Sequence, residues 1–237
     1  KVVDNALKGT TGTYAIYIKN FKTGESYAKD IDLEFEAGSL YKLWIMATAF
    51  KQIQDGNLKE DEKLSEDVET LNNMFDIDPD AQELTEGTIT LTVSDAINQM
   101  ITISHNYAAL LLTEKIKSSV ANFLKDGGDS PKSTASDIAL FFEKLYHGEL
   151  VSKEYSEKMI NLLKEQKLND GLPKYLPDKS MVANKTGDIG WLKHDGGIVF
   201  TDSGDWVIVI MSESDYPPGA QERIALVSKA VYDYFTK

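Results

Sequence analysis

The sequence predicts a mixed α/β (α+β) domain in which one antiparallel sheet is flanked by helices and joined to an all-helical lobe. Strand-like alternation occurs near both ends of the chain, and a long stretch between them has helical spacing. The chain has 237 residues, 42% of them hydrophobic, which suits one sizeable globular unit. Strands from both ends that share one sheet, with the helices packed on it, are the simplest arrangement for this order.

The first elements follow from local patterns. Residues 13–20 alternate and are rich in β-branched and aromatic types, and the turn FKTGES leads into a second extended piece, which predicts a hairpin. Apolar residues recur with helical spacing over 39–54, and QDGN ends that helix. Residues 55–90 are polar and irregular, and DIDPDAQ is expected to be a loop.

Four further helices precede a return to strands. Thr92 or Ser94 is expected to cap the helix TVSDAINQMI, and YAALLLTEKIKSSVANFL predicts another helix. Thr134 with Asp137 resembles a capping box that opens the helix SDIALFFEKLYHG, and residues 153–167 are amphipathic.

The carboxy-terminal part has a period of two. MVANKTGDI, HDGGIVFT and DWVIVIMSE predict three strands, and residues 217–236 predict a closing helix. We therefore expect one domain over 1–237, with a sheet lobe at about 1–50 and 178–237 and a helical lobe at about 51–177.

Composition and charge exclude several classes of protein. The net charge is −13 and Arg223 is the only arginine, so we expect no nucleic-acid partner. The absence of cysteine excludes disulfides and thiolate metal sites, and no histidine spacing suits a metal, so no metal or cofactor is expected. No apolar run is long enough to span a bilayer, and the opening KVVDNALKG contains no signal peptide, as in a processed secreted domain.

Two Ser-x-x-Lys pairs are candidates for a nucleophile and its base. Ser26 and Lys29 fall in or beside the hairpin, where residues three apart point to opposite faces. Ser39 and Lys42 fall on the first turn of a helix, where they share a face, and the helix dipole there favours developing negative charge. Capping of the helix by Ser39 is the structural alternative, and for this pair alone it is the commoner case.

Two further motifs carry polar groups suited to a binding site. A Ser-x-Asn at 104–106 separates two predicted helices, and a Lys-Thr-Gly at 185–187 lies on a predicted strand, where glycine lets a ligand approach the backbone. A second Lys-Thr-Gly at 22–24 is ordinary turn chemistry in the first hairpin. Taken alone, the Ser-x-Asn is better explained by capping a helix and filling a turn, and each motif by itself is a weak signal.

Together, the three motifs occur in the order and on the elements typical of penicillin-binding proteins and class A β-lactamases. The chain resembles that family over nearly its whole length, including the stretches TLTVSDAINQMITISHNYAALLL, LNDGLPKYLP and NKTGDIGWLKHDGGIV. The resemblance implies a β-lactamase/transpeptidase-like fold, an α/β sandwich with an all-helical lobe and a site between the lobes.

The resemblance also implies the catalytic roles. Ser39 would be the acyl-forming nucleophile, and Lys42 would take or relay its proton. A lysine does this only when it is partly neutral, which requires burial or a nearby positive charge that Lys185 would supply. Ser104 would pass the proton to the leaving nitrogen.

The binding roles follow in the same way. Asn106 would hold the amide side chain of the substrate, and Lys185 with Thr186 would bind its carboxylate. Gly187 completes this motif, and the backbone N–H groups of Ser39 and Asp188 would form an oxyanion hole, each worth about 3 kcal/mol.

The chain departs from the class A pattern at the loop that carries the deacylating glutamate. The interval between the helices, KDGGDSPK at 125–132, contains Asp126 and Asp129 but no glutamate. Glu165 matches the local Glu-x-x-Leu-Asn form at the wrong place in the chain, so we expect a solvated residue at a helix end.

Other departures concern basic residues. His105 replaces the usual aspartate and is expected to be structural or exposed, and His194 beside Asp195 suggests neither a metal site nor a triad. The usual arginine partner of the substrate carboxylate is not evident. Arg223 is expected at the surface, and Lys193 is the substitute.

Three functions remain open from the sequence. The first is an acyl-transferring serine hydrolase of D,D-peptidase character that is acylated by β-lactams and deacylates slowly. The second is an active class A β-lactamase in which Asp126, Asp129 or Glu165 is the base, and the third is a non-catalytic domain that binds β-lactams or wall peptides. A monomer that is secreted, periplasmic or held in the cell envelope, with a β-lactam or a peptidoglycan stem peptide as partner, follows from the resemblance.

Overall fold

The computed structural model describes residues 1–116 and 131–237. The chain forms two compact units. One consists of Lys1–Leu40 with Lys132–Lys237 and is called the sheet unit here. The other, Tyr41–Pro131, is called the helical unit.

A five-stranded antiparallel sheet organises the sheet unit, with strand order β2-β1-β9-β8-β7. The first strand pairs with the last, since Ile16 lies opposite Ile210, so the two ends of the chain share one sheet as predicted. The strands are β1 (Thr13–Asn20), β2 (Ser26–Lys29), β7 (Val182–Ile189), β8 (Leu192–Val199) and β9 (Trp206–Glu213).

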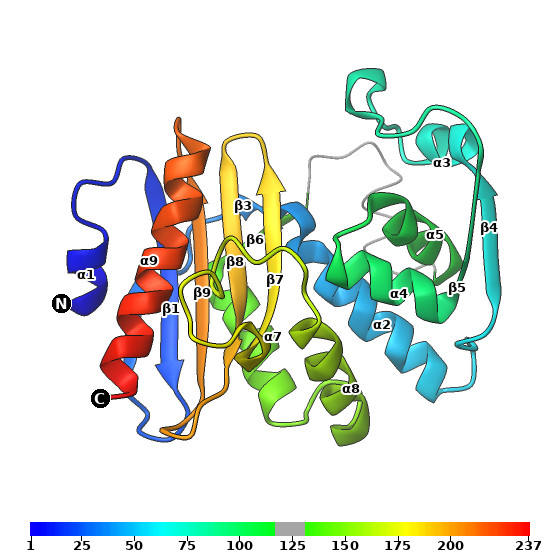
Figure 1. Cartoon of the computed structure of the whole chain (residues 1–237). Coiled ribbons are helices and arrows are strands. Elements are labelled where there is room, and N and C mark those ends of the chain that lie inside the picture. Colours follow the sequence, from blue (N-terminus) through cyan, green and yellow to red (C-terminus); the bar gives the residue numbers. More distant parts are fainter. Residues whose placement is uncertain (117–130) are drawn as a thin grey trace. The chain divides into compact units, whose positions relative to one another are not determined.

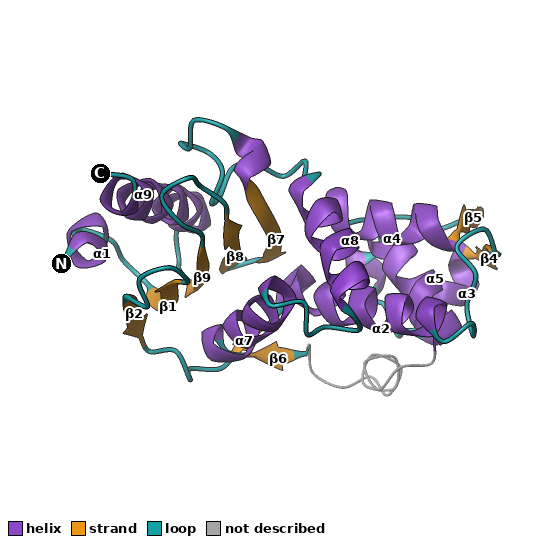
Figure 2. Cartoon of the chain, turned by 90° about the horizontal axis from the view of Figure 1, so that it is seen from below, coloured by secondary structure: helices purple, strands orange, loops and turns teal. Residues whose placement is uncertain are grey.

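Helices cover both faces of this sheet (Figure 2). α1 (Val2–Ala6) and α9 (Pro217–Phe235) lie on one face, and α7 (Ala135–Tyr146) lies on the other, while α8 (Lys153–Lys164) packs beside β7. Burial from both sides explains why β9 is apolar almost throughout instead of alternating. The core under α9 contains Trp206, Ile208, Ile210, Ile224 and Val227.

The helical unit is built on α2 (Lys42–Gln54), against which α4 (Val93–Thr102) and α5 (Asn106–Ile116) pack (Figure 1). The predicted cap of α4 is confirmed, because the Thr92 hydroxyl accepts the Asp95 N–H at 3.0 Å. In the sheet unit, the Thr134 hydroxyl caps α7 in the same way through Asp137.

The expectation that residues 55–90 are irregular was wrong, although the expected loop DIDPDAQ contains only the short 3₁₀ turn Pro79–Ala81. This stretch contains β4 (Lys63–Asp67), α3 (Val68–Met74) and β5 (Thr88–Thr92), and β4 pairs with β5. Each element is short and buries few apolar side chains, so its periodicity is weak. The helix predicted over 39–54 begins as a 3₁₀ turn at Gly38–Tyr41, and α1 was not predicted.

The division into units also differs from the expected lobe boundaries. Residues 41–50 group with the helical unit because α2 packs against α4 and α5. Residues 132–177 group with the sheet unit because α7 and α8 pack on the strands. A two-residue pairing of β3 (Phe35–Glu36) with β6 (Lys132–Ser133) joins the two stretches of the sheet unit beside Ser39.

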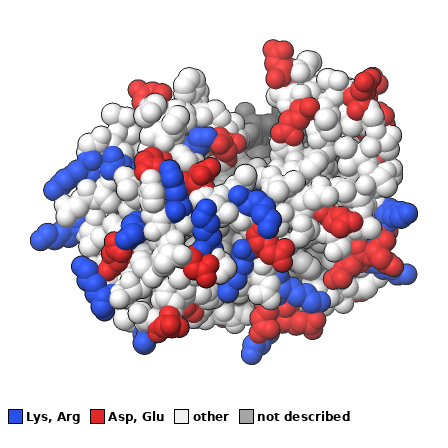
Figure 3. Space-filling view, in the orientation of Figure 1, with Lys and Arg blue, Asp and Glu red and all other residues white. Residues whose placement is uncertain are grey.

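The surface charge is uneven on the face drawn in Figure 3. Acidic side chains predominate on the visible face of the helical unit, while lysines and acidic residues are interspersed on that of the sheet unit. Of the helices in the described residues, none is both long and apolar enough to cross a bilayer.

Candidate active site

Ser39 lies in the 3₁₀ turn Gly38–Tyr41, which runs directly into α2 at Lys42. Ser39 therefore precedes the first residue of α2, Lys42, by three positions, as the Ser-x-x-Lys pattern requires. Gly38 has φ +51, a left-handed conformation that other residues adopt at a cost. The alternative role of Ser39 as a cap is not observed, because the N-cap position of α2 is Tyr41.

A buried histidine anchors the segment before Ser39 to the sheet. His194 on β8 is 1% exposed, and its Nδ1 accepts the Ser212 N–H at 3.1 Å. The proton therefore lies on Nε2, which donates to the Glu36 carbonyl at 2.9 Å. Burial lowers the pKa of His194, which keeps the ring neutral. Both ring nitrogens of His194 are thus engaged with the backbone, which is a structural role.

The Lys-Thr-Gly strand lies directly against the serine turn. Gly187 allows this approach, since a Cβ on it would lie 2.9 Å from the Ala37 carbonyl oxygen. A Cβ on Gly38 would lie 3.1 Å from the Asp188 backbone nitrogen. The two glycines therefore let the backbone before Ser39 pass close to that of Asp188, with no room for a side chain between them.

Lys42 lies at the centre of a polar cluster in the helical unit. Its side chain is fully buried, and Nζ donates to the Ser104 carbonyl oxygen at 2.6 Å, to Ser104 Oγ at 3.2 Å and to Asn106 Oδ1 at 2.6 Å. Burial lowers the pKa of Lys42 to about 7, while the negative charge of Glu83 opposes the shift. Two causes of a lowered Lys42 pKa were expected, burial and a nearby positive charge. Burial is the one that lowers it here.

The backbone of Ser104 adopts an unusual conformation beside this cluster. Ser104 has φ +59, and such left-handed conformations in non-glycine residues concentrate at functional sites. The bend turns both its carbonyl and its hydroxyl toward Lys42. His105 is half-buried and its Nδ1 accepts the Ala108 N–H at 3.2 Å, so it caps α5 and is structural, as expected.

Glu83 is a member of the cluster that sequence reasoning missed. Its Oε1 accepts the Asn106 Nδ2–H at 2.7 Å. Glu83 lies in a polar loop 23 residues before Asn106, and no motif links the two. The one signal available was the concentration of acidic residues in this loop.

Lys185 is fully buried on β7, which is the edge strand of the sheet. Its Nζ donates to the Thr186 carbonyl at 2.9 Å. Lys185 and Gly187 share one face of the strand by alternation, and half-buried Thr186 lies on the other. The Asp188 carboxylate forms an ion pair with Lys193, so Lys193 is engaged with a neighbour on the sheet.

Asp195 supports this strand from within the sheet unit. The carboxylate is fully buried and accepts hydrogen bonds from Asn184 Nδ2 and from the Leu172 N–H, both at 2.8 Å. A Cβ on Gly171 would lie 2.1 Å from Asp195 Oδ2, so only glycine fits there. Burial raises the pKa of Asp195 to about 7, against the effect of Lys185 and the hydrogen bonds.

The remaining predicted residues take positions of their own or fall outside the described residues. Glu165 is exposed at the C-cap of α8, as expected, and Asp126 and Asp129 fall in the stretch 117–130 outside the described residues. Arg223 is half-buried, and its guanidinium donates to the Ala6 carbonyl, so it joins α9 to α1 instead of lying free on the surface.

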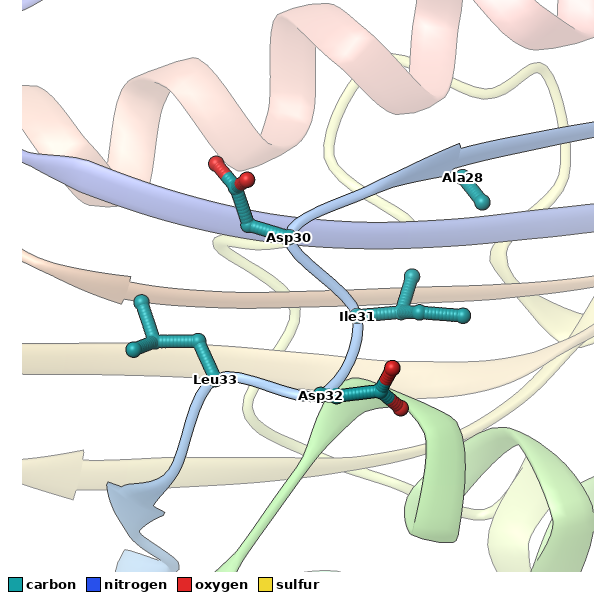
Figure 4. Close-up of a pocket in the computed structure, with 5 residues that line it drawn as sticks. All are labelled: Ala28, Asp30, Ile31, Asp32 and Leu33. Atoms are coloured by element: carbon teal, nitrogen blue, oxygen red, sulfur yellow. The ribbon is translucent and has the colours of Figure 1, made fainter.

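Two further features of the described residues lie outside the predicted motifs. Within 1–116 and 131–237, no group of His, Asp or Glu side chains is arranged to hold a metal ion. A hollow of about 490 Å³ follows β2. Figure 4 shows Asp30 and Leu33 pointing to one side of this loop and Ile31 and Asp32 to the other. The hollow is lined by two aspartates and three apolar residues and contains no predicted site residue.

The chain was compared with protein families, curated sequences and solved structures. The family model described as the beta-lactamase enzyme family matches residues 1–235. A mutant of PBP-A in an acyl-enzyme complex with penicillin-G has a TM-score of 0.82 at 24% identity, covering 99% of this chain and 94% of that one. No curated protein sequence matches the chain.

Other solved structures show the same fold. A β-lactamase from Sphaerobacter thermophilus has a TM-score of 0.79 at 22% identity, covering 99% of this chain and 95% of that one. A mutant of the class A β-lactamase of the last common ancestor of Gram-negative bacteria has a TM-score of 0.81 at 19% identity, covering 100% and 99%. At these identities the likeness concerns the fold.

Proposed function

Because the chain belongs to the beta-lactamase enzyme family, we propose that it is a serine hydrolase that forms an acyl-enzyme on Ser39 with β-lactams or peptidoglycan stem peptides. The observation that carries the proposal is the burial of Lys42 among Ser104 and Asn106, with a pKa of about 7. A lysine with this pKa is neutral in half of the molecules at neutral pH, so it can accept a proton.

The proposed acylation proceeds in two proton transfers. Neutral Lys42 takes the proton of Ser39 Oγ as the oxygen attacks the carbonyl carbon of the substrate. The resulting oxyanion is stabilised by the backbone N–H groups of Ser39 and Asp188. The carbon–nitrogen bond then breaks, and the proton passes through Ser104, which is bonded to Lys42, to the leaving nitrogen.

We assign substrate recognition to the polar groups of the Lys-Thr-Gly and Ser-x-Asn motifs. Lys185 and Thr186 bind the carboxylate common to penicillins and stem peptides, with the Gly187 backbone close beside it. Asn106 contacts the amide side chain. This substrate class places the proposed activity in the cell envelope or outside the cell, where peptidoglycan is found.

We further propose that hydrolysis of the acyl-enzyme is slow, as in a D,D-peptidase trapped by penicillin. The support is in the sequence, where the interval 125–132 contains no glutamate to activate water. In the described residues, Glu165 is exposed on the surface of the sheet unit. An active β-lactamase would instead use Asp126, Asp129 or Glu165 as a base.

Intact-mass measurement after incubation with penicillin-G tests the proposal. We expect one covalent adduct, its absence in Ser39→Ala, and a lifetime of minutes or longer. Ser26→Ala is the matched control, because it removes the serine of the other Ser-x-x-Lys pair. An adduct that clears within seconds, with turnover that collapses when Asp126, Asp129 or Glu165 becomes alanine, would identify a β-lactamase. No adduct would favour a binding domain.

The close contact at Gly38 gives a second expected result. Gly38 and Gly190 both have φ +51, but nothing lies within 4 Å of a Cβ on Gly190. Alanine at either position therefore costs about 1–2 kcal/mol of stability from backbone strain. Gly38→Ala additionally crowds the Asp188 N–H and should slow acylation about 10- to 100-fold. Equal acylation rates in both variants would exclude the proposed oxyanion hole.

A further inference from the structure

The carboxamide of Asn106 is held between a cation and an anion. Its Oδ1 accepts from Lys42 Nζ at 2.6 Å, and its Nδ2 donates to Glu83 Oε1 at 2.7 Å. An ammonium group offers only donors and a carboxylate only acceptors. If the Asn106 amide were flipped, its NH2 group would face the Lys42 ammonium and its oxygen would face the Glu83 carboxylate, and neither pair could form a hydrogen bond. Glu83 and Lys42 therefore fix the orientation of Asn106 jointly.

The loop that carries Glu83 is anchored beside α5 by its next residue. The Leu84 N–H donates to the Tyr107 hydroxyl at 3.1 Å, and that hydroxyl donates to Asn72 Oδ1 at 2.9 Å. Asn72 Nδ2 donates to the Leu84 carbonyl at 2.9 Å. Tyr107 and Asn72 are each 3% exposed, and Tyr107 follows Asn106 in the chain. This buried network places Glu83 next to Asn106 although Glu83 itself is exposed.

We propose that Glu83 is a positioning residue for the acylation reaction, which orients Asn106 toward Lys42 and stabilises the ammonium form of Lys42 through its charge. The inference rests on the proposed function, because it concerns the base of that reaction. Glu83 acts through Asn106 and Lys42, and it neither accepts the proton of Ser39 nor activates water.

The charge of Glu83 gives this role a pH signature. Burial lowers the pKa of Lys42, and Glu83 raises it, so removal of the Glu83 charge lowers it further. Acylation requires neutral Lys42, whose fraction rises with pH. The rising limb of the pH–rate profile should therefore move to lower pH in Glu83→Gln.

The other titratable groups near Lys42 are not substituted in any variant, but His105 also responds to the charge of Glu83. His105 is adjacent, and its pKa is lowered by burial and by Lys42 while Glu83 raises it. The Tyr41 ring lies 6.0 Å from Lys42 Nζ, and burial raises the pKa of its hydroxyl to about 12. On the helices that pack against α2, Asp95 of α4 and Glu114 and Lys115 of α5 lie two turns or more from Ser104 and Asn106. Lys185, which also bears on the proposed site, is unchanged.

The experiment measures single-turnover acylation by penicillin-G from pH 5 to 9. Glu83→Gln keeps an acceptor for Asn106. In this variant we expect the rising limb to shift toward lower pH by about half a pH unit or more. On the acidic side, this shift corresponds to an acylation rate about threefold faster than that of the wild type. Glu83→Ala also frees the Asn106 amide, so its rate on the high-pH plateau should fall. Glu86→Gln removes an exposed carboxylate of the same loop and is the matched control with an unshifted limb.

A direct titration separates this inference from the proposed function. The Lys42 side chain is followed by NMR in protein labelled with ¹³C-lysine, and its signal is identified by its loss in Lys42→Arg. We expect its pKa to be lower in Glu83→Gln than in the wild-type protein, whether or not an adduct forms. Absence of a wild-type adduct would count against the proposed function alone.

Two results would overturn the inference. One is a Glu83→Gln protein whose Lys42 titrates as in the wild type. The other is a Glu83→Gln protein that acylates at the wild-type rate but no longer clears its adduct, because Glu83 would then be the base for hydrolysis.

Discussion

Replacing Lys42 with arginine is expected to slow acylation of Ser39 about 10²- to 10⁴-fold, the usual contribution of a general base. Arginine keeps the positive charge and can donate hydrogen bonds to Ser104 and Asn106, but it does not lose a proton in proteins. The variant therefore separates the charge of Lys42 from its basicity. The single-turnover rate of adduct formation with penicillin-G, measured by mass spectrometry, gives the result.

Lys51 provides the matched control for this substitution. It lies on the same helix, is exposed, and forms an ion pair with Asp55 at 2.5 Å. Lys51→Arg should therefore acylate at the wild-type rate. Thermal unfolding of both variants identifies any loss of folding caused by the larger side chain. A folded Lys42→Arg protein that acylates within tenfold of the wild type would show that Lys42 is not the base.

The wild-type protein should show the corresponding pH dependence. Burial lowers the pKa of Lys42 to about 7, so the neutral form predominates above pH 7 and decreases below it. The acylation rate should therefore fall about tenfold for each pH unit below 6.

Replacing Asp195 with alanine is expected to cost about 2–6 kcal/mol of folding free energy. Two buried donors, Asn184 Nδ2 and the Leu172 N–H, would lose their acceptor, at about 1–3 kcal/mol each. Chemical denaturation of the two proteins measures the difference directly. Asp202→Ala, at an exposed turn, should change the stability by less than about 0.5 kcal/mol.

Asp195 also connects the stability of the fold to the site. Asn184 precedes Lys185 on β7, and Leu172 lies in the loop after α8, so the carboxylate fastens that loop to the strand of the Lys-Thr-Gly motif. Gly171→Ala should have a similar effect, because the added Cβ would displace Asp195. A cost below 1 kcal/mol in both variants would contradict this role.

The sequence predicted the candidate site best where a motif could be assigned to a particular type of secondary-structure element. The motifs at Ser39, Ser104 and Lys185 were assigned to a helix start, an interhelical turn and a strand, and each lies on or beside such an element. The alternation of the terminal strands also predicted one shared sheet. Few other folds fit a two-residue period with apolar runs at both ends of the chain.

What the sequence did not predict depends on contacts between distant residues. Glu83 reaches Asn106 only because Tyr107 and Asn72 anchor the loop at Leu84, and no local pattern encodes that path. The left-handed conformation of Ser104 is also not predictable from the sequence, since serine rarely adopts it. The pairing of β4 with β5 spans a polar stretch whose strands bury few side chains, so alternation gave no clear signal.

The pairing of β1 with β9 has a consequence for the order in which the protein acquires its structure on the ribosome. The helical unit is one continuous stretch, so it can assemble as soon as it has been synthesised. The hairpin of β1 and β2 must wait for β9, almost two hundred residues later, to cover its inner edge. Until then that edge is open to pairing with other chains, and sheets built from such remote partners form slowly. We therefore expect the nascent sheet, more than the helices, to need protection by chaperones.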